Sequence, residues 1–456
     1  MALDLLLTLG VLLSTASQLR PAGAAVGPGE ICLAVWALLR LSREIGRLGP
    51  MLSPPFCKLL IFWMVFAVGQ CVGTMAGFAA GDRHDPVLFM HDVAAYPLLA
   101  AVSCLSVVEP GAGSRLHRVA WLVATLGAAW LTLQVAFGFG LINLGDYDTW
   151  EWERFRGFSD NANQLADLCM VLGLISLHLV EVARRFGQKI VALICMSVAI
   201  VVGRLTKSDA FLLVLITSGP IFIVLKLWRW LMSLDRPLTL RSASAWILVL
   251  ALPLVVAYVT PLGASMATTF EDVIKSMTKG GGGRDTDETT RLRFEVWKVA
   301  MRRGIEAGML GLGPGPHLEI PPSIVAGRRD SMNDPKHVEH PKVGFVANFE
   351  AHNTFLDLFI QGGLIAVLSL GWLVATAFVA THRAELDALT TLLCGLAMFS
   401  IFHLIVRHPT FWFAISLCLV AAADLRRTPT VRVWGLKSGG ALSAFSIPSR
   451  SWRSRA

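Results

Sequence analysis

Charged and titratable side chains beside long apolar runs are the residues of this chain best suited to chemistry. Such groups are costly at or within a bilayer, so each is a functional candidate by default. Seven stand out: Arg156, Arg204, Lys207, Asp209, Arg293, His352 and Arg407. A mainly cationic set suits an anionic headgroup such as a diphosphate, which one arginine can clamp with two donors at once. Snorkelling or plain surface charge is the alternative reading, above all for Arg156 and Arg407.

His352 is the candidate proton acceptor of this set. It lies in the segment EAHNT, directly before an apolar run that starts at Phe355. An interfacial histidine without a chemical role is the alternative. A metal site would have to use the polar residues His317, His337, Glu339 and His340. Only the i, i+3 spacing of the two histidines in HVEH, residues 337–340, favours a metal. The neighbouring residues are typical of a flexible loop, so the sequence predicts no metal site.

Membrane helices must position these residues. Hydrophobic residues make up 54% of the chain and charged residues 16%, and the mean hydropathy is +0.61. A helix needs about 20 apolar residues to cross the hydrocarbon core. The apolar runs predict an all-α, polytopic integral membrane protein with about 12 transmembrane helices and one long periplasmic loop. The predicted spans are 3–19, 27–42, 57–80, 92–109, 119–143, 163–181, 188–203, 208–227, 243–261, 354–380, 386–405 and 408–424.

Lysine and arginine in the short connections predict the orientation. With the N-terminus in the cytoplasm, the most basic short connections fall on the cytoplasmic side, and the long arginine-rich segment 262–353 is the exception. These connections are residues 40–58, 115–118, 184–189 and 226–241. The opposite loops are acidic or mixed, so both termini are predicted to be cytoplasmic. The net charge of +8 follows from this distribution, and we expect membrane lipids as partners and no nucleic acid.

The longest polar segment, residues 262–353, is predicted to be periplasmic. It contains a possible interfacial helix near 266–278, a glycine run at 280–283 and an amphipathic helix over about 291–308. Apolar surroundings are expected for Leu292, Val296, Val299 and Ala300. The chain therefore divides into helices 1–9 over 1–261, the loop 262–353, helices 10–12 over 354–425 and a basic cytoplasmic tail over 426–456. This topology would bring all seven candidates to the periplasmic face.

Four stretches of the chain resemble the O-antigen ligase and polymerase superfamily of membrane glycosyltransferases. The segment RGFSDNANQLA at 156–166 is similar to the opening of a middle helix in that family, and RFEVW at 293–297 to its R-x-x-x-W helix. GLGPG at 311–315 is similar to the glycine turn that follows. AHNTFL at 351–356, continuing to QGGL at 361–364, is similar to its H-N-x-x-L…G signature. The likeness covers about residues 150–425, and the order of the four motifs is more specific than any one of them.

One departure concerns a Ser-Arg pair that the family often shows where a periplasmic helix begins. If Ser208 occupies the serine position, Asp209 stands in place of the arginine. Arg204 or Lys207 could then supply the positive charge.

The resemblance implies a metal-independent inverting glycosyltransferase without cofactors, in the bacterial inner membrane and with its active site facing the periplasm. It would transfer a glycan from undecaprenyl diphosphate to an acceptor hydroxyl. Arg293, with Arg204 or Lys207, would stabilise the leaving diphosphate, and His352 would accept the proton. Further substrate-binding candidates are Arg156, Asn163, Asn353 and Trp297. Helix capping is an equal alternative for the two asparagines, and the glycines at 311, 313 and 315 are expected to permit a tight turn.

Two enzymatic readings stay open. A polymerase of O-antigen or exopolysaccharide would use a second lipid-linked glycan as acceptor, and a ligase would use lipid A-core or another terminal acceptor. We favour the polymerase. A membrane transporter or lipid-glycan flippase is the rival from another class, but the candidate charges concentrate at one face and the spans show no strong internal repeat.

Overall fold

The computed structural model describes residues 1–21, 26–46, 53–82, 86–143, 145–151, 153–232, 284–319 and 349–427. The following predicted features lie outside these residues: the span 243–261, the helix near 266–278, the glycine run 280–283, the loop residues His337, Glu339 and His340, and the tail beyond residue 427.

The described chain is almost entirely helical. Its elements are α1 (Ala2–Leu13), the 3-10 helix η1 (Ser17–Leu19), α2 (Pro28–Ile45), α3 (Pro54–Ala80), α4 (Pro86–Ser106), α5 (Ala112–Gly138), β1 (Trp150–Glu151), β2 (Arg154–Phe155), α6 (Ala162–Val182), α7 (Phe186–Leu205), α8 (Asp209–Met232), α10 (Arg284–Glu306), α12 (Thr354–Arg383), α13 (Asp387–Phe399) and α14 (Pro409–Arg427). The two short strands pair antiparallel, with Trp150 opposite Phe155.

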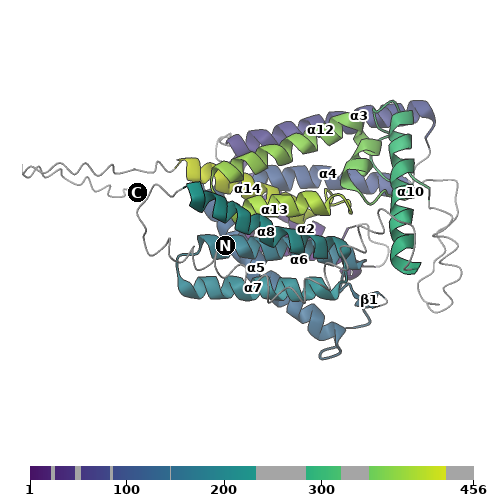
Figure 1. Cartoon of the computed structure of the whole chain (residues 1–456). Helices are drawn as coiled ribbons and strands as arrows, with labels where there is room; N and C mark the ends of the chain where they lie inside the picture. The colour runs from purple at the N-terminus through teal and green to yellow at the C-terminus, as the bar shows by residue number, and fades with distance from the viewer. Residues whose placement is uncertain are drawn as a thin grey trace, which may run out of the picture.

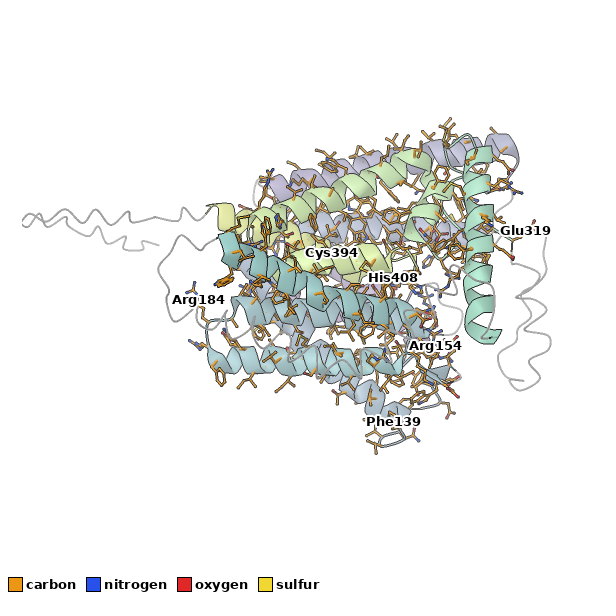
Figure 2. All side chains as sticks on the ribbon, viewed as in Figure 1. Phe139, Arg154, Arg184, Glu319, Cys394 and His408 are labelled. Atoms are coloured by element: carbon orange, nitrogen blue, oxygen red, sulfur yellow. The ribbon has the colours of Figure 1, made fainter. Side chains whose placement is uncertain are left out.

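Most helices run side by side, and α10 lies across one end of this bundle (Figure 1). We call that end the α10 end and the opposite one the far end. The connection between α5 and α6 reaches the α10 end, where Figure 2 labels Arg154, while Arg184 between α6 and α7 lies at the far end. Polar loops that are distant in the sequence therefore meet at the α10 end.

Seven helices are long and apolar enough to cross a membrane, namely α3, α4, α5, α6, α7, α8 and α12. Helices α1, α13 and α14 are apolar but have shorter apolar segments. The predicted all-α, polytopic membrane architecture is thus confirmed for the described residues. The expected count of about 12 spans remains a prediction.

Helix α12 is not continuous, although its apolar run predicted one unbroken span. Gly362 and Gly363 leave the helical conformation, and Gly363 has φ 63° and ψ −160°, a backbone shape that glycine adopts without steric cost. The break frees two carbonyl groups for outside donors: Leu312 N donates to Ile360 O at 2.7 Å, and Gly313 N donates to Gln361 O at 2.8 Å. The glycine turn after α10 is thereby fastened to the middle of α12.

The predicted span 386–405 ends early, because α13 stops at Phe399. Its 13 residues give a length of about 20 Å, less than the roughly 30 Å of a hydrocarbon core. Residues 400–408 are non-helical and bond to the start of α12: Thr354 N donates to Ser400 O at 2.8 Å, and Thr354 Oγ1 donates to His403 O at 2.5 Å.

The predicted amphipathic helix is present as α10. Val296 and Ala300 are buried, as expected, in a small cluster with Leu312, Ala351 and Ile360. Val299 was expected to be covered, but it is 53% exposed. Only one side of α10 packs against α12 and the glycine turn. The row of buried residues on α10 is therefore narrower than the sequence pattern indicates.

Candidate functional site

His352 lies in the short connection that enters α12, and its backbone is held in an unusual shape. Its φ of 51° places it in the left-handed region, which costs about 1–2 kcal/mol for a residue with a side chain. One carboxyl group spans this turn. Asp357 Oδ1 accepts from Ala351 N at 2.7 Å, and Asp357 Oδ2 accepts from Asn353 N at 3.1 Å. The backbone on both sides of His352 is therefore fixed by Asp357.

Trp297 of α10 fixes the same turn from the other side. Its indole Nε1 donates to Ala351 O at 3.1 Å. The Trp297 ring also lies 6.4 Å from the ring of Phe402, in the segment after α13. Trp297 was a substrate-binding candidate; the structure gives it a contact that ties α10 to the His352 turn.

The His352 imidazole is exposed and is surrounded by charged neighbours from several elements. Partial burial lowers the pKa of His352 below its usual value, and the positive charge of Arg293 lowers it further. The negative charge of Glu350 acts in the opposite direction and raises this pKa. Arg293, on α10, is half-buried and interacts electrostatically with Asp209, the first residue of α8, and with Arg154. A general base must be neutral before it accepts a proton, and the guanidinium of Arg293 favours the neutral form of the His352 imidazole.

Two further histidines lie in the segment between α13 and α14. Burial and the charges of Arg293, His352 and His408 hold the pKa of His403 well below its usual range. Burial and the neighbouring Arg407 lower the pKa of His408 to about 4. Both rings are therefore neutral at physiological pH. Neither histidine was a candidate, because His403 fell in the predicted span 386–405 and His408 in the predicted span 408–424. The polar residues at 403, 407 and 408, followed by a proline, were the available signal.

Arg154 is the second cation near Arg293, and sequence reasoning also missed it. Arg154 Nη2 donates to Asn163 Oδ1 at 2.7 Å, and Arg154 Nε donates to Thr206 O at 3.2 Å. These bonds fix the guanidinium between the start of α6 and the end of α7. Its place two residues before Arg156, in the same loop, was the only sequence signal for it.

Arg407 forms a partly buried ionic network next to these groups. Its Nη2 lies 2.5 Å from Asp92 Oδ2 on α4, and its Nη1 pairs with Glu350, two residues before His352. Burial alone lowers the pKa of Arg407, but Glu350 and Asp92 outweigh burial and raise it well above the ordinary value. Asp92 Oδ2 also accepts from Gly315 N at 3.1 Å. Arg407, considered earlier as a possible surface charge, instead links α4 to the His352 turn.

The glycine turn completes this framework. Gly311, Gly313 and Gly315 all have φ between 90° and 104°, which confirms the expected tight turn. Gln361, beside the break in α12, donates from Nε2 to Gly315 O at 3.1 Å and accepts from Tyr96 at 2.9 Å. The turn thus bonds to both α4 and α12.

Several predicted binding residues are occupied by internal contacts. Arg156 Nη2 lies 2.8 Å from Asp148 Oδ2, and Lys207 Nζ lies 2.6 Å from Glu153 Oε2. Arg204 is exposed at the end of α7. Asn353 Oδ1 accepts from the first amides of α12, which agrees with the capping alternative.

Metal ligands can be considered only for the described part of the chain. No group of three or more His, Cys, Asp or Glu side chains is arranged there to hold an ion. His317, one of the residues weighed for a metal, lies 2.8 Å from Asp82 Oδ2 through Nδ1 and 2.8 Å from Gly313 O through Nε2.

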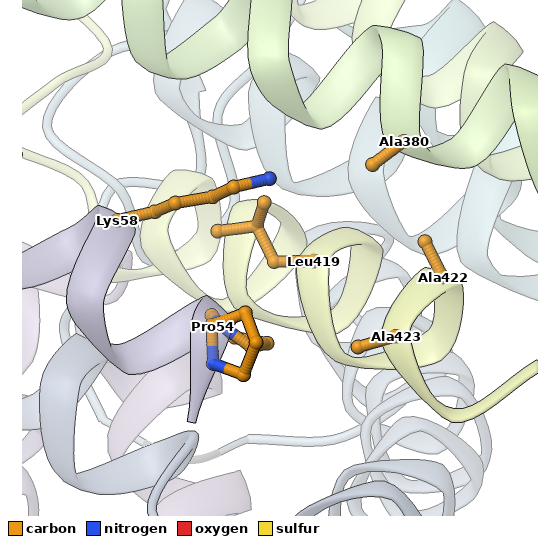
Figure 3. A pocket seen from close by; sticks show the side chains of 7 residues that line it. Pro54, Lys58, Ala380, Leu419, Ala422 and Ala423 are labelled. Carbon is orange, nitrogen blue, oxygen red and sulfur yellow. The ribbon is translucent and has the colours of Figure 1, made fainter. Parts of the chain in front are cut away.

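A separate pocket of about 180 Å³ opens at the far end, between the start of α3 and the ends of α12 and α14. Figure 3 shows Lys58 reaching across it above Leu419. It lies away from the histidines, so it is not part of this site.

Two comparisons bear on identity. A search of curated proteins found no match. Residues 191–371 match the family described as O-antigen ligase. That stretch contains Arg204, Lys207, Arg293, the glycine turn, His352 and the break in α12. This stretch of an all-α polytopic membrane protein is therefore similar to the O-antigen ligase family.

Proposed function

We propose that the protein transfers a glycan from undecaprenyl diphosphate to an acceptor hydroxyl at the periplasmic face of the inner membrane. The observation that carries this proposal is the group formed by His352, Arg293 and Arg154 at one end of the bundle. These residues come from three distant parts of the chain. Two guanidinium groups suit a diphosphate, and a neutral imidazole beside them suits the hydroxyl of an acceptor sugar.

The proposed reaction is a single displacement. The acceptor oxygen attacks the anomeric carbon from the face opposite the lipid diphosphate, and its proton passes to His352. The bond between the anomeric carbon and the diphosphate oxygen breaks, and its electron pair stays with the diphosphate. Arg293, with Arg154 in place of the earlier candidates Arg204 and Lys207, stabilises the charge that grows there. Configuration at the anomeric carbon is inverted.

Positive charge at fixed positions can neutralise the leaving group without a divalent ion. Arg154 supports this role because Asn163 and Thr206 already hold its guanidinium, so little reorganisation is needed when charge develops. Lys207 is a weaker candidate because Glu153 already pairs with it.

We further propose that the acceptor is a second lipid-linked glycan, which makes the protein a polysaccharide polymerase. The length of the polar segment 262–353, which is sufficient to cover a long glycan, supports this choice. The second candidate is a ligase that transfers the glycan to lipid A-core, and the description of the matched family favours it.

The acceptor separates the two candidates. Purified protein is incubated with lipid-linked repeat units as the sole substrate, and the products are resolved by size. A polymerase gives a ladder spaced by one repeat, because its acceptor is another molecule of its substrate. Products that form only after lipid A-core is added would instead establish the ligase.

His352→Ala tests the shared chemistry, with His382→Ala as the matched control. His382 is an exposed histidine of α12 at the far end of the same helix. Loss of a general base reduces turnover by about 10²–10⁴-fold, so His352→Ala should give almost no product, while His382→Ala retains activity. Normal product formation by a well-expressed His352→Ala protein would remove His352 from the mechanism.

A further inference from the structure

A pocket of about 260 Å³ lies at the far end of the bundle, away from the candidate active site. The starts of α1 and α5 and the end of α2 form its walls. Its charged lining consists of the N-terminal Met1, Asp4, Arg40, Arg43, Arg115 and Arg118. Four arginines from two helices that are distant in sequence thus surround one small space.

The two innermost arginines are part of the protein interior. Arg40 is 6% exposed and Arg115 is 8% exposed. Arg115 Nη2 donates to two backbone carbonyl groups, Ser106 O and Val108 O, each at 2.8 Å. Its Nε has no hydrogen-bond partner among the described residues. A buried guanidinium held by carbonyl groups keeps its full positive charge, and this charge borders the pocket.

Carboxylates balance only part of the positive charge. Asp4 Oδ2 lies 3.0 Å from Arg118 Nε, and Glu44 Oε1 lies 2.7 Å from Arg40 Nη2. Within the described part of the chain, neither Arg43 nor Arg115 forms an ion pair at contact distance, although the charges of Asp4 and Glu44 act on Arg115 from farther away. The pocket therefore has an excess of cationic groups with donors arranged for an anion, and guanidinium forks match the oxygens of a phosphate.

An exposed apolar face of α2 next to the pocket indicates that the phosphate belongs to a lipid. Along α2, Val35 and Leu39 stand eight and four residues before Arg43, so they share the helix face from which Arg43 projects. Their exposed fractions are 42% and 47%. In a membrane protein an exposed apolar face of this kind contacts acyl chains. A lipid whose chains lie along α2 would bring its headgroup to the end of that helix, where Arg43 lies.

We propose that this pocket binds the phosphate of an anionic membrane lipid. Arg43 and Arg118, at the rim, contact the phosphate oxygens, and the charges of Arg40 and Arg115 attract it from below. The acyl chains lie on the exposed face of α2. This site is independent of the proposed glycosyl transfer, because none of its residues belongs to the group around His352.

The test uses native mass spectrometry of the full-length protein released from mixed micelles that contain phosphatidylcholine and phosphatidylglycerol. Wild-type protein should retain phosphatidylglycerol in preference to phosphatidylcholine. Arg43→Gln should weaken this retention by about fivefold, and Arg43→Gln combined with Arg118→Gln by about thirtyfold, given the usual contribution of one arginine near an anionic lipid surface. Arg43→Gln leaves the partner of Asp4 intact, so its fold is preserved if the double variant is unstable.

The matched control is Arg184→Gln combined with Arg185→Gln, two exposed arginines at the same end of the bundle (Figure 2). It removes the same charge and should leave lipid retention unchanged. Equal loss in the control variant would overturn the proposal, because general surface charge would then explain binding. Displacement of the lipid by inorganic phosphate at equal concentration would also overturn it, because the site would then recognise a free anion.

Discussion

The carboxyl group of Asp357 offers the sharpest test of how the site is assembled. It accepts from the backbone amides on both sides of His352, at 2.7 Å and 3.1 Å. In Asp357→Asn, one oxygen remains as an acceptor, and the other is replaced by an NH₂ group. That NH₂ group faces a backbone N–H, so one buried donor loses its partner. We expect the His352 turn to relax while the rest of α12 stays folded.

The size of the effect follows from the contacts. An unsatisfied buried donor costs about 1–3 kcal/mol. The left-handed conformation of His352 costs a further 1–2 kcal/mol or so, and the turn can escape this cost by relaxing. The cost of the unsatisfied donor lowers the fraction of protein in which the His352 turn has its catalytic conformation. We therefore expect kcat to fall by about fivefold to a hundredfold. KM for the lipid-linked donor should change little, because Arg293 and Arg154 remain in place.

The assay is steady-state glycan transfer with purified protein, with Asp167→Asn as the control. Asp167 is also a buried carboxyl group on a helix, 1% exposed, but it bonds Thr410 at 3.1 Å and has no contact with the His352 turn. Asp167→Asn should retain kcat, since an amide oxygen can accept the same bond. An unchanged kcat in a folded Asp357→Asn protein would refute the role of the carboxyl clamp, and an equal loss in both variants would assign the effect to general destabilisation.

Three further predictions concern charge, topology and metal. Glu350 raises the pKa of His352, so Glu350→Gln should lower that pKa and move the acidic limb of the pH–rate profile to lower pH; a move to higher pH would contradict the electrostatic account. Alkaline phosphatase fused after Gly282 should be active and fused after Gly439 inactive, and the reverse pattern would invert the predicted topology. Transfer should survive EDTA, because arginines are assigned to the leaving group, and activity restored only by magnesium would show that a metal is required.

The helices of the bundle were predictable because the bilayer constrains length and polarity together. A span must cover about 30 Å with apolar residues, so runs such as 57–80 and 163–181 locate α3 and α6 to within a few residues. Helix α10 was predictable from its amphipathic pattern. These features depend on local sequence alone, and for that reason they agree with the structure.

The interruptions could not be predicted in the same way. An apolar run gives the same signal whether its backbone is helical or bent, so neither the break at Gly362 nor the end of α13 at Phe399 was expected. Both interruptions depend on distant partners. The glycine turn at 311–313 supplies donors to the break in α12, and Thr354 supplies contacts to residues 400–408. The placement of His403 follows from these contacts.

The choice of cation beside Arg293 depends on contacts that residue type alone does not reveal. Lys207 and Arg204 were selected because they stand near the expected Ser-Arg position, but Lys207 is paired with Glu153 and exposed. Arg154 instead donates hydrogen bonds to Asn163 and Thr206, and its positive charge acts on Arg293 and lowers the pKa of that residue. A guanidinium that is fixed before the substrate arrives stabilises developing charge better than a flexible ammonium that must first leave a carboxylate. We therefore infer that Arg154 replaces the missing arginine of the pair, and that Asn163 acts by positioning Arg154 and not by contacting the glycan.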